Sequence, residues 1–201
     1  MKKIRSDFKQ HYIFNALESE VLYDLLDIMN GNCNAEIKLF SNNMKKIKTY
    51  KVLPLKIYVS TYYGRRYVLV WNYLFKRFAF YRLDRIKESC KSNECINKNE
   101  MMMRADTVVQ KLWGVSLGKE NYIEKLEMTV RIANGEEYIL KRLEREKRNG
   151  TIQKLANGDY KFRAEVYDAS EMIPWIKTFT GRIVEIKCSN ECVEKTNKRR
   201  F

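Results

Sequence analysis

Apolar and polar positions follow two different periods in the first half of the chain. Between residues 15 and 30 apolar side chains recur every three or four positions, as in an amphipathic helix, and Asn30-Gly31-Asn32 can end it in a left-handed conformation. After residue 35 the period falls to two. Short strands joined by tight turns, without helices between them, favour a small closed or partly closed β-barrel. Strands are expected at 35–41, 48–52, 57–61, 66–71 and 78–82.

In the second half of the chain, helices alternate with strands. Asn157-Gly158 is a strong type I′ signal for a hairpin turn. Ser170 is expected to cap a helix that has Pro174 in its first turn, where proline is tolerated. The resulting β-α-β-β-α-β order is that of a ferredoxin-like unit. The pattern predicts a strand at 125–133, a helix at 136–147, a hairpin of 151–155 with 159–167, a helix through 172–176 and a strand at 182–187.

Polar segments separate these regions. Residues 87–103 are expected to be an irregular linker, followed by a short helix at 106–112, and the charged tail after Cys188 is expected to fray. The predicted fold class is α+β, with a small barrel followed by a ferredoxin-like domain. The predicted regions are an N-terminal helical segment at 1–34, the barrel at 35–88, a linker with a short helix at 89–121, the ferredoxin-like domain at 122–188 and the tail at 189–201.

The composition indicates a folded and strongly basic chain. Of its 201 residues 45% are hydrophobic, and 39 Lys and Arg against 25 Asp and Glu give a net charge of +14. This balance favours a polyanionic partner, nucleic acid rather than a membrane surface, although a solvated basic surface has the same composition. No apolar run approaches the ~20 residues that span a bilayer, and the N-terminus lacks the apolar core of a signal peptide. A cytoplasmic location is therefore expected.

The five cysteines are an odd number, which argues against a secreted disulfide framework. Cys90 and Cys95 lie in CKSNEC, and Cys188 and Cys192 lie in the similar CSNEC. Four thiolates can hold zinc in principle, but neither spacing matches the usual two-residue knuckle. Ordinary reduced surface cysteines are expected, with no metal and no cofactor.

Catalytic chemistry is not indicated. The single histidine, His11, lies near the N-terminus, so a histidine-based triad or relay is almost excluded. The eight glycines are scattered over turns, and no cluster of carboxylates suggests a magnesium site. No catalytic residue is assigned, and the chain is not expected to be an enzyme.

Aromatic and basic side chains crowd into the barrel region between residues 53 and 86. Strand-borne aromatics interleaved with cationic groups suit stacking on bases while pairing with phosphates. Strand alternation sends half or more of the rings into the core. The aromatic residues are Tyr58, Tyr62, Tyr63, Tyr67, Trp71, Tyr73, Phe75, Phe78, Phe80 and Tyr81, and the basic ones are Lys56, Arg65, Arg66, Lys76, Arg77, Arg82 and Arg85.

Residues 35–86 resemble a WYL domain, the Sm-like (SH3-like) β-barrel of many bacterial regulators. The matching segments are KLFS, VLPLKIY, GRRYVLVW and FYRLDRI. Residues 122–188 resemble the C-terminal extension that usually follows this barrel, and LWGVSLG matches the bridge. The tripeptide that names the family reads Arg66-Tyr67-Val68 here. Residues 1–34 are too few for the family's winged helix-turn-helix, so the chain is expected either to be a fragment or to bind without its own DNA reader.

The resemblance implies a ligand-binding regulatory module whose ligands include nucleic acid, single-stranded DNA in at least some members. Carried over by position, the pocket would use Phe40 and Ser41 from the first barrel strand, Tyr67 from the naming motif, and Arg82 and Arg85 from RLDRI. Both guanidinium groups can converge on one phosphate. A ring from Tyr67 or Phe40 can stack on a base, and Ser41 can hydrogen-bond a phosphate oxygen.

Three further arginines are candidates for ligand contact. Arg77 is expected to add a phosphate contact. Arg142 and Arg145 lie on the helix predicted at 136–147 and are second-domain candidates, although a solvated face diluted by neighbouring glutamates is the simpler interpretation.

Two of the pocket residues have structural alternatives. Tyr67 can equally lie in the barrel core. Arg85 can form a salt bridge with Asp84 or Glu88, because surface pairs of this kind are common and weak.

The sequence thus predicts a regulatory, ligand-sensing module of the transcriptional-regulator type, expected to be a homodimer. Its ligand would be single-stranded nucleic acid or a nucleotide-like anion. One rival is a protein-interaction and dimerisation module that uses the helix at 15–30. Another, resting on family analogy alone, is an accessory RNA-binding factor of a CRISPR-type defence system.

Overall fold

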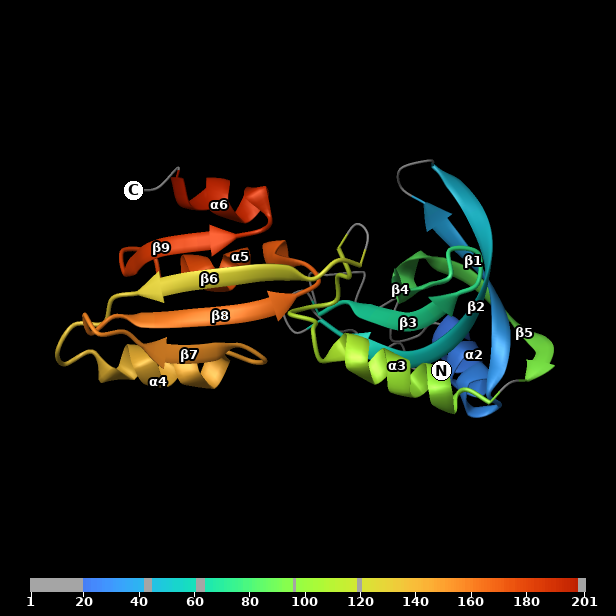
Figure 1. The fold of residues 1–201 in the computed structure, drawn as a ribbon. Coiled ribbons are helices and arrows are strands. Elements are labelled where there is room, and N and C mark those ends of the chain that lie inside the picture. Colours follow the sequence, from blue (N-terminus) through green and yellow to red (C-terminus); the bar gives the residue numbers. More distant parts are fainter. Residues whose placement is uncertain (1–19, 42–44, 61–63, 96, 119–120, 199–201) are drawn as a thin grey trace, which may run out of the picture. The chain divides into compact units, whose positions relative to one another are not determined.

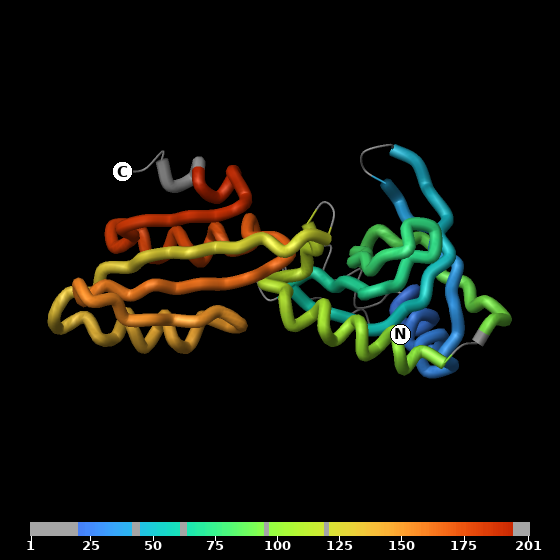
Figure 2. The backbone as a smooth tube through the Cα atoms, viewed as in Figure 1, coloured from blue at the N-terminus to red at the C-terminus, as the bar shows by residue number. Residues whose placement is uncertain are grey.

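The alternating pattern of the first half forms a five-stranded antiparallel sheet, and the second half forms a four-stranded one. The computed structural model describes residues 20–41, 45–60, 64–95, 97–118 and 121–198 (Figures 1 and 2). The chain divides into two units, Met1–Asp106 and Thr107–Phe201, each with its own core. The predicted combination of helices with antiparallel sheets is confirmed at this level.

In the first unit a helix precedes the sheet and another follows it. The elements are α2 Glu20–Asn30, β1 Cys33–Ser41, β2 Lys46–Val59, β3 Arg66–Asn72, β4 Arg77–Arg82, a 3₁₀ turn Leu83–Arg85, β5 Ile86–Cys95 and α3 Asn99–Val109. The strand order is β4-β3-β2-β1-β5, and every pair is antiparallel. The 3₁₀ turn carries the chain from β4, at one edge of the sheet, to β5 at the other.

β2 is one long strand where the sequence predicts two, at 48–52 and 57–61. It runs through Pro54, and its pairing with β3 shifts register between Pro54 and Lys56. Proline has no N–H to donate to the ladder, and a bulge accommodates it while the strand continues. The register shift changes which residues of β2 share a face of the sheet. A simple alternation of faces carried through Pro54 therefore places the side chains on one side of Pro54 on the wrong face.

The core of the first unit lies between α2 and one face of the sheet. Leu25 is 0% exposed and Ile28 2%, which confirms the predicted amphipathic helix over its described part; residues 15–19 lie outside the described ranges. Tyr23 and Leu26, on the outer side of α2, are exposed. The other buried members of this core are Cys33, Ala35, Ile37, Val52, Val68, Val70, Leu83 and Ile86.

The predicted irregular linker at 87–103 is wrong. β5 pairs with β1 along the first part of this stretch, and α3 follows in place of the helix predicted at 106–112. Among the described side chains of β5 only those of Ile86 and Ser89 are buried. The strand therefore carries no apolar alternation, which is the signal that predicts a strand from sequence.

The second unit has the predicted alternation of strands and helices. Its elements are β6 Glu124–Val130, α4 Glu137–Glu146, β7 Thr151–Lys154, β8 Tyr160–Val166, a 3₁₀ turn Ala169–Met172, α5 Ile173–Lys177, β9 Ile183–Cys188 and α6 Glu191–Lys198. The sheet order is β7-β8-β6-β9, again with antiparallel pairs only. Figure 1 shows α4 and α5 on one face of this sheet, where Leu143, Phe162 and Ile176 belong to the core.

Three local predictions in the second unit are wrong. Asp168, and not Ser170, caps the 3₁₀ turn, because its carboxylate accepts the Ser170 N–H at 3.0 Å. In Asn157-Gly158 only the glycine has a positive φ, of 89°, whereas a type I′ turn needs positive φ at both residues. The tail after Cys188 begins as α6, whose Val193 is 1% exposed and joins the core.

A half-buried carboxylate holds the segment that leads into β6. Glu171 accepts the backbone N–H groups of Val115 at 3.1 Å and Ser116 at 3.0 Å. A Cβ on Gly114 would lie 2.5 Å from an oxygen of the same carboxylate, so any side chain there displaces Glu171. Burial raises the pKa of Glu171, and the backbone donors only partly offset this.

We expect the Glu171 carboxyl to titrate above the ordinary glutamate pKa, because it is half-buried. The Glu136 carboxyl should titrate below the ordinary pKa, because Arg182 donates a hydrogen bond to it. The contribution of Glu171 to folding is then complete below the ordinary pKa and is lost as pH rises through its raised folded-state pKa. Carbon-detected NMR of the carboxyl groups measures both midpoints, with Glu171→Gln for assignment. A Glu171 midpoint at or below that of Glu136 would contradict this arrangement.

Candidate functional site

Three side chains form a row across β2, β3 and β4. Tyr67 stands opposite Tyr58 on one side and opposite Arg82 on the other. Residues paired across antiparallel strands point to the same face of a sheet. The neighbouring Val68 belongs to the core beneath α2, so Tyr67 points to the opposite face. Tyr58, Tyr67 and Arg82 together form the tyrosine–arginine row.

Aromatic packing supports the row from the same face. The rings of Tyr58 and Phe80 are 5.5 Å apart between centroids and meet edge to face at 81°. Burial raises the pKa of Tyr58, which keeps its hydroxyl neutral and able to donate a hydrogen bond. Tyr67 is half-buried. The row therefore offers two partly accessible phenol groups beside a guanidinium.

A carboxylate holds the guanidinium of Arg82 at two points. Nε of Arg82 donates to Oδ1 of Asp84 at 3.0 Å, and Nη2 lies 2.5 Å from Oδ2. Both side chains are largely buried, at 19% and 20% exposed. A two-point pair fixes the plane of an arginine, so the direction in which Arg82 presents its other N–H groups is set by Asp84.

Arg85 lies in the 3₁₀ turn directly after the row and is half-buried. The alternative that it pairs with Asp84 or Glu88 is wrong, since Asp84 binds Arg82 and Glu88 binds Lys38 at 2.7 Å. Within the described ranges Arg85 has no ion-pair partner. It is thus a cation close to Arg82 in the chain, and no described carboxylate neutralises its charge.

α3 contributes two contacts to the same face. Asp106 forms an ion pair with Lys56, and the guanidinium of Arg104 lies 4.9 Å from the ring centroid of Trp71. The ring of Trp71 also meets Phe78 edge to face at 5.1 Å. This part of the face is therefore filled by the protein's own side chains.

The other predicted pocket residues lie elsewhere in the sheet. Phe40 and Ser41 end β1, opposite Ile47 and Lys46 at the start of β2, whereas the row crosses β2 near its end. Arg77 begins β4, with its guanidinium 5.5 Å from the ring of Phe75. Strand pairing thus brings Tyr67 and Arg82 together but not Phe40, Ser41 or Arg77, and ligand binding by any of them stays a prediction.

The two predicted arginines of the second unit belong to a network around Glu146. Nε of Arg142 donates to Glu146 at 3.1 Å, Arg145 donates at 3.0 Å and the indole N–H of Trp175 donates at 3.1 Å. Burial raises the pKa of Glu146, but these donors together outweigh it and leave the pKa below its ordinary value. Arg142 also lies 5.1 Å from the ring of Phe179. Both arginines thus have internal partners.

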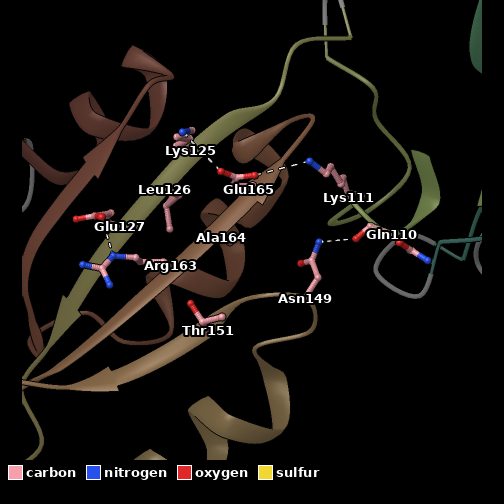
Figure 3. Close-up of a pocket in the computed structure, with 10 residues that line it drawn as sticks. All are labelled: Gln110, Lys111, Lys125, Leu126, Glu127, Asn149, Thr151, Arg163, Ala164 and Glu165. Carbon is pink, nitrogen blue, oxygen red and sulfur yellow. Dashed lines mark hydrogen bonds and ion pairs between the residues drawn. The ribbon is translucent and has the colours of Figure 1, made fainter. Parts of the chain in front are cut away.

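A groove of about 770 Å³, which the sequence does not predict, lies on the second sheet (Figure 3). Its outward side chains alternate with the buried residues of β6 and β8, a polar alternation that could have indicated an open face. Its cations are matched by two glutamates. Arg163 binds Glu127 at 2.8 Å, while Lys125 and Lys111 lie 3.6 and 3.7 Å from Glu165. The groove is polar and nearly charge-balanced, which is poorly suited to a polyanion.

The cysteines differ in environment. Cys33 is disulfide-bonded, a state that the sequence does not predict. Cys90 and Cys192 are exposed, as expected, but Cys188 is buried. Within the described residues, no group of three or more His, Cys, Asp or Glu is arranged to hold a metal ion. No helix in the same part of the chain is long and apolar enough to cross a membrane.

Comparisons with known proteins concern the fold. No family model and no curated protein matches the chain. The crystal structure of a CRISPR Cas-related protein is similar, with a TM-score of 0.56 at 10% identity, over 90% of this chain and 50% of that one. Proteasome accessory factor B/C of Arthrobacter aurescens gives a TM-score of 0.43 at 11% identity, over 90% of this chain and 26% of the other. The chain spans half or less of the length of these two proteins.

Proposed function

We propose that the chain is a WYL-type regulatory module that binds single-stranded nucleic acid, or a nucleotide-like anion, at the tyrosine–arginine row. The row carries the proposal because it sets two tyrosines beside a guanidinium whose orientation Asp84 fixes. A ring can stack on a base while the guanidinium pairs with the next phosphate. Arg85 adds a second cation within one turn of the chain.

The strand orders support the finer fold that the WYL resemblance implies. A helix followed by five strands in the order β4-β3-β2-β1-β5 suits an Sm-like barrel. The β-α-β-β-α-β order with the sheet β7-β8-β6-β9 suits a ferredoxin-like extension. In such a module the ligand acts by shifting an equilibrium between arrangements of domains or subunits, and so controls an attached or partner activity.

The Arg82→Ala, Arg85→Ala double variant is expected to bind a labelled single-stranded oligonucleotide about 10- to 100-fold more weakly, because hydrogen bonds to charged groups are worth about 1.5–3 kcal/mol. Fluorescence anisotropy at low salt measures the loss. The matched control is Lys111→Ala, Lys125→Ala, which removes the same charge from the groove of the second unit. Equal weakening in both variants would sink the assignment of the row.

A second candidate function is protein interaction and dimerisation, which the exposed apolar residues of α2 favour. Tyr23 is 70% exposed and Leu26 40%. In this case Leu26→Glu changes the oligomeric state in sedimentation velocity, and the Arg82/Arg85 variant binds oligonucleotide no differently from the unaltered chain. The predicted homodimer stays a prediction under either function.

A third candidate is an accessory RNA-binding factor of a CRISPR-type defence system. The fold-level similarity to a CRISPR Cas-related protein favours it. This candidate uses the same binding chemistry as the first proposal, but its preferred ligand is RNA. Tighter binding of single-stranded RNA than of DNA with the same sequence would favour it.

A further inference from the structure

The lysines of β2 differ in charge pairing according to the face on which they lie. On the face of the tyrosine–arginine row, Lys51 lies 2.7 Å from Glu94 and Lys56 pairs with Asp106. These cations are neutralised by the protein's own carboxylates. Exposed pairs of this kind contribute little to stability, but each lowers the net positive field of its surroundings.

Lys46 and Lys48 project from the opposite face. Lys48 stands opposite Leu39, which packs against the core beneath α2, so Lys46, Lys48 and Tyr50 share that face at intervals of about 7 Å. Both lysines are exposed, and among the residues that the structure describes neither has an ion-pair partner. No acidic residue occurs anywhere between Glu36 and Asp84. Within the described ranges, no carboxylate therefore neutralises the charges of these two lysines.

A ladder of aromatic rings continues the lysine row. The ring of Tyr50 lies 5.9 Å from that of Phe75 on one side and 5.9 Å from that of Tyr81 on the other. Phe75 is 51% exposed. Asn72, which is fully buried, holds both ends: its Nδ2 donates to the Tyr81 hydroxyl at 2.6 Å, and its Oδ1 accepts the Phe75 N–H at 3.0 Å. The rings are thus held in place in the unliganded chain.

Two further cations border the exposed end of the ladder. The guanidinium of Arg77 lies 5.5 Å from the ring centroid of Phe75. Lys76 is exposed in the β3–β4 turn, where its φ of 49° turns the chain sharply. The most exposed ring of the ladder therefore lies among positive charges.

We propose that Lys46, Lys48, Tyr50, Phe75 and Arg77 form a second contact surface for single-stranded nucleic acid, with a base stacked on Phe75 and phosphates bound along the lysines. This lysine–aromatic surface rests on the proposed function and adds to it a binding surface on the other face of the sheet. Held rings beside lysines that no described carboxylate neutralises are the combination that suits single strands, whereas a duplex hides its base faces in the stack. An acidic protein partner would need the charges but not the exposed ring.

The stacking half of the proposal is tested by Phe75→Ala, with Leu74→Ala as its control. Leu74 lies in the same turn and is 69% exposed, but it has no ring. Because a stacked base is lost with the ring, Phe75→Ala should weaken binding of a labelled single-stranded oligonucleotide about 5- to 150-fold. Leu74→Ala should bind like the unaltered chain.

The electrostatic half is tested by Lys46→Ala, Lys48→Ala against Lys38→Ala, Lys51→Ala. Both variants lose two charges from the same sheet, but the control lysines are paired with Glu88 and Glu94. Log affinity falls linearly with log salt concentration, and the loss of two phosphate contacts makes this fall less steep by about 1.4. We expect that change in the Lys46/Lys48 variant and no change of slope in the control.

The outcomes separate this inference from the function on which it rests. Weaker oligonucleotide binding by Phe75→Ala and by the Lys46/Lys48 variant, but not by their controls, supports the lysine–aromatic surface. Loss only in the Arg82/Arg85 variant overturns the surface and leaves the proposed function standing. Absence of single-strand binding by the unaltered chain at low salt overturns both.

Discussion

Phe162→Ala is expected to lower the free energy of unfolding of the second unit by about 3–5 kcal/mol, the usual cost of removing a buried aromatic side chain. Phe162 is 0% exposed on β8, and its ring lies 6.4 Å from that of Trp113 and 5.0 Å from that of Trp175. A Cβ on Gly150 would lie 2.2 Å from the same ring, so the chain packs closely around it. Domains are stable by about 5–15 kcal/mol in total, so the loss is a large share.

Urea unfolding followed by tryptophan fluorescence measures this loss, because Trp113 and Trp175 both contact Phe162. Tyr138→Ala is the matched control, since Tyr138 is an aromatic residue of the same unit that is 60% exposed. We expect the control to change the midpoint little. A loss below about 1 kcal/mol in Phe162→Ala would show that this ring is not the centre of the core.

Leu25→Ala is expected to destabilise the first unit by about 2.7–5 kcal/mol, the range for buried leucines that leave a cavity. Leu25 is 0% exposed and joins α2 to the sheet. The adjacent Leu26→Ala removes the same atoms from the same helix at a position that is 40% exposed. Because little cavity forms there, its cost should be much smaller.

Hydrogen exchange at the amides of β1 and β3 measures the effect of Leu25→Ala, because both strands contribute residues to the core that contains Leu25. Protection should fall in the first unit for Leu25→Ala and stay near that of the unaltered chain for Leu26→Ala. Equal effects of the two substitutions would mean that α2 does not pack on the sheet through the face described. If Leu26→Ala left amide protection unchanged but altered the oligomeric state, the result would favour the dimerisation module.

Periodicity predicted the elements with one clearly apolar face. α2 has Leu25 and Ile28 on its buried side, and the strands of the second unit alternate in the expected way. The sequence does not predict β5, because only two of its described side chains, Ile86 and Ser89, are buried. The strand is held by its pairing with β1. Tertiary pairing of this kind is not a local property of the chain.

The candidate site was harder to predict than the fold. Tyr67 and Arg82 meet because β3 and β4 are consecutive strands, and this follows from the sequence once the hairpin is recognised. The placement of Phe40 depends on the full length of β2 and on its bulge at Pro54, which no local pattern gives. The sequence offers Arg85 as a salt-bridge partner for Asp84, but the structure pairs Asp84 with Arg82, which lies on its other side in the chain.

Charge pairing was beyond sequence reasoning altogether. The stretch between Glu36 and Asp84 is basic throughout. Its lysines nevertheless divide into those that pair with a carboxylate from β5 or α3, such as Lys51 and Lys56, and those with no such partner among the described residues, such as Lys48. The difference depends on which face each lysine occupies, and one residue of register reverses it.

The most direct test of the central claim is the affinity of the unaltered chain for single-stranded DNA, single-stranded RNA and duplex DNA of one sequence, measured by fluorescence anisotropy across a salt series. The account predicts that one or both single strands bind more tightly than the duplex, with an affinity that falls steeply with salt and persists at physiological ionic strength. Equal, weak affinities that vanish at physiological salt would contradict it, because the charge of the chain would then be only a nonspecific field.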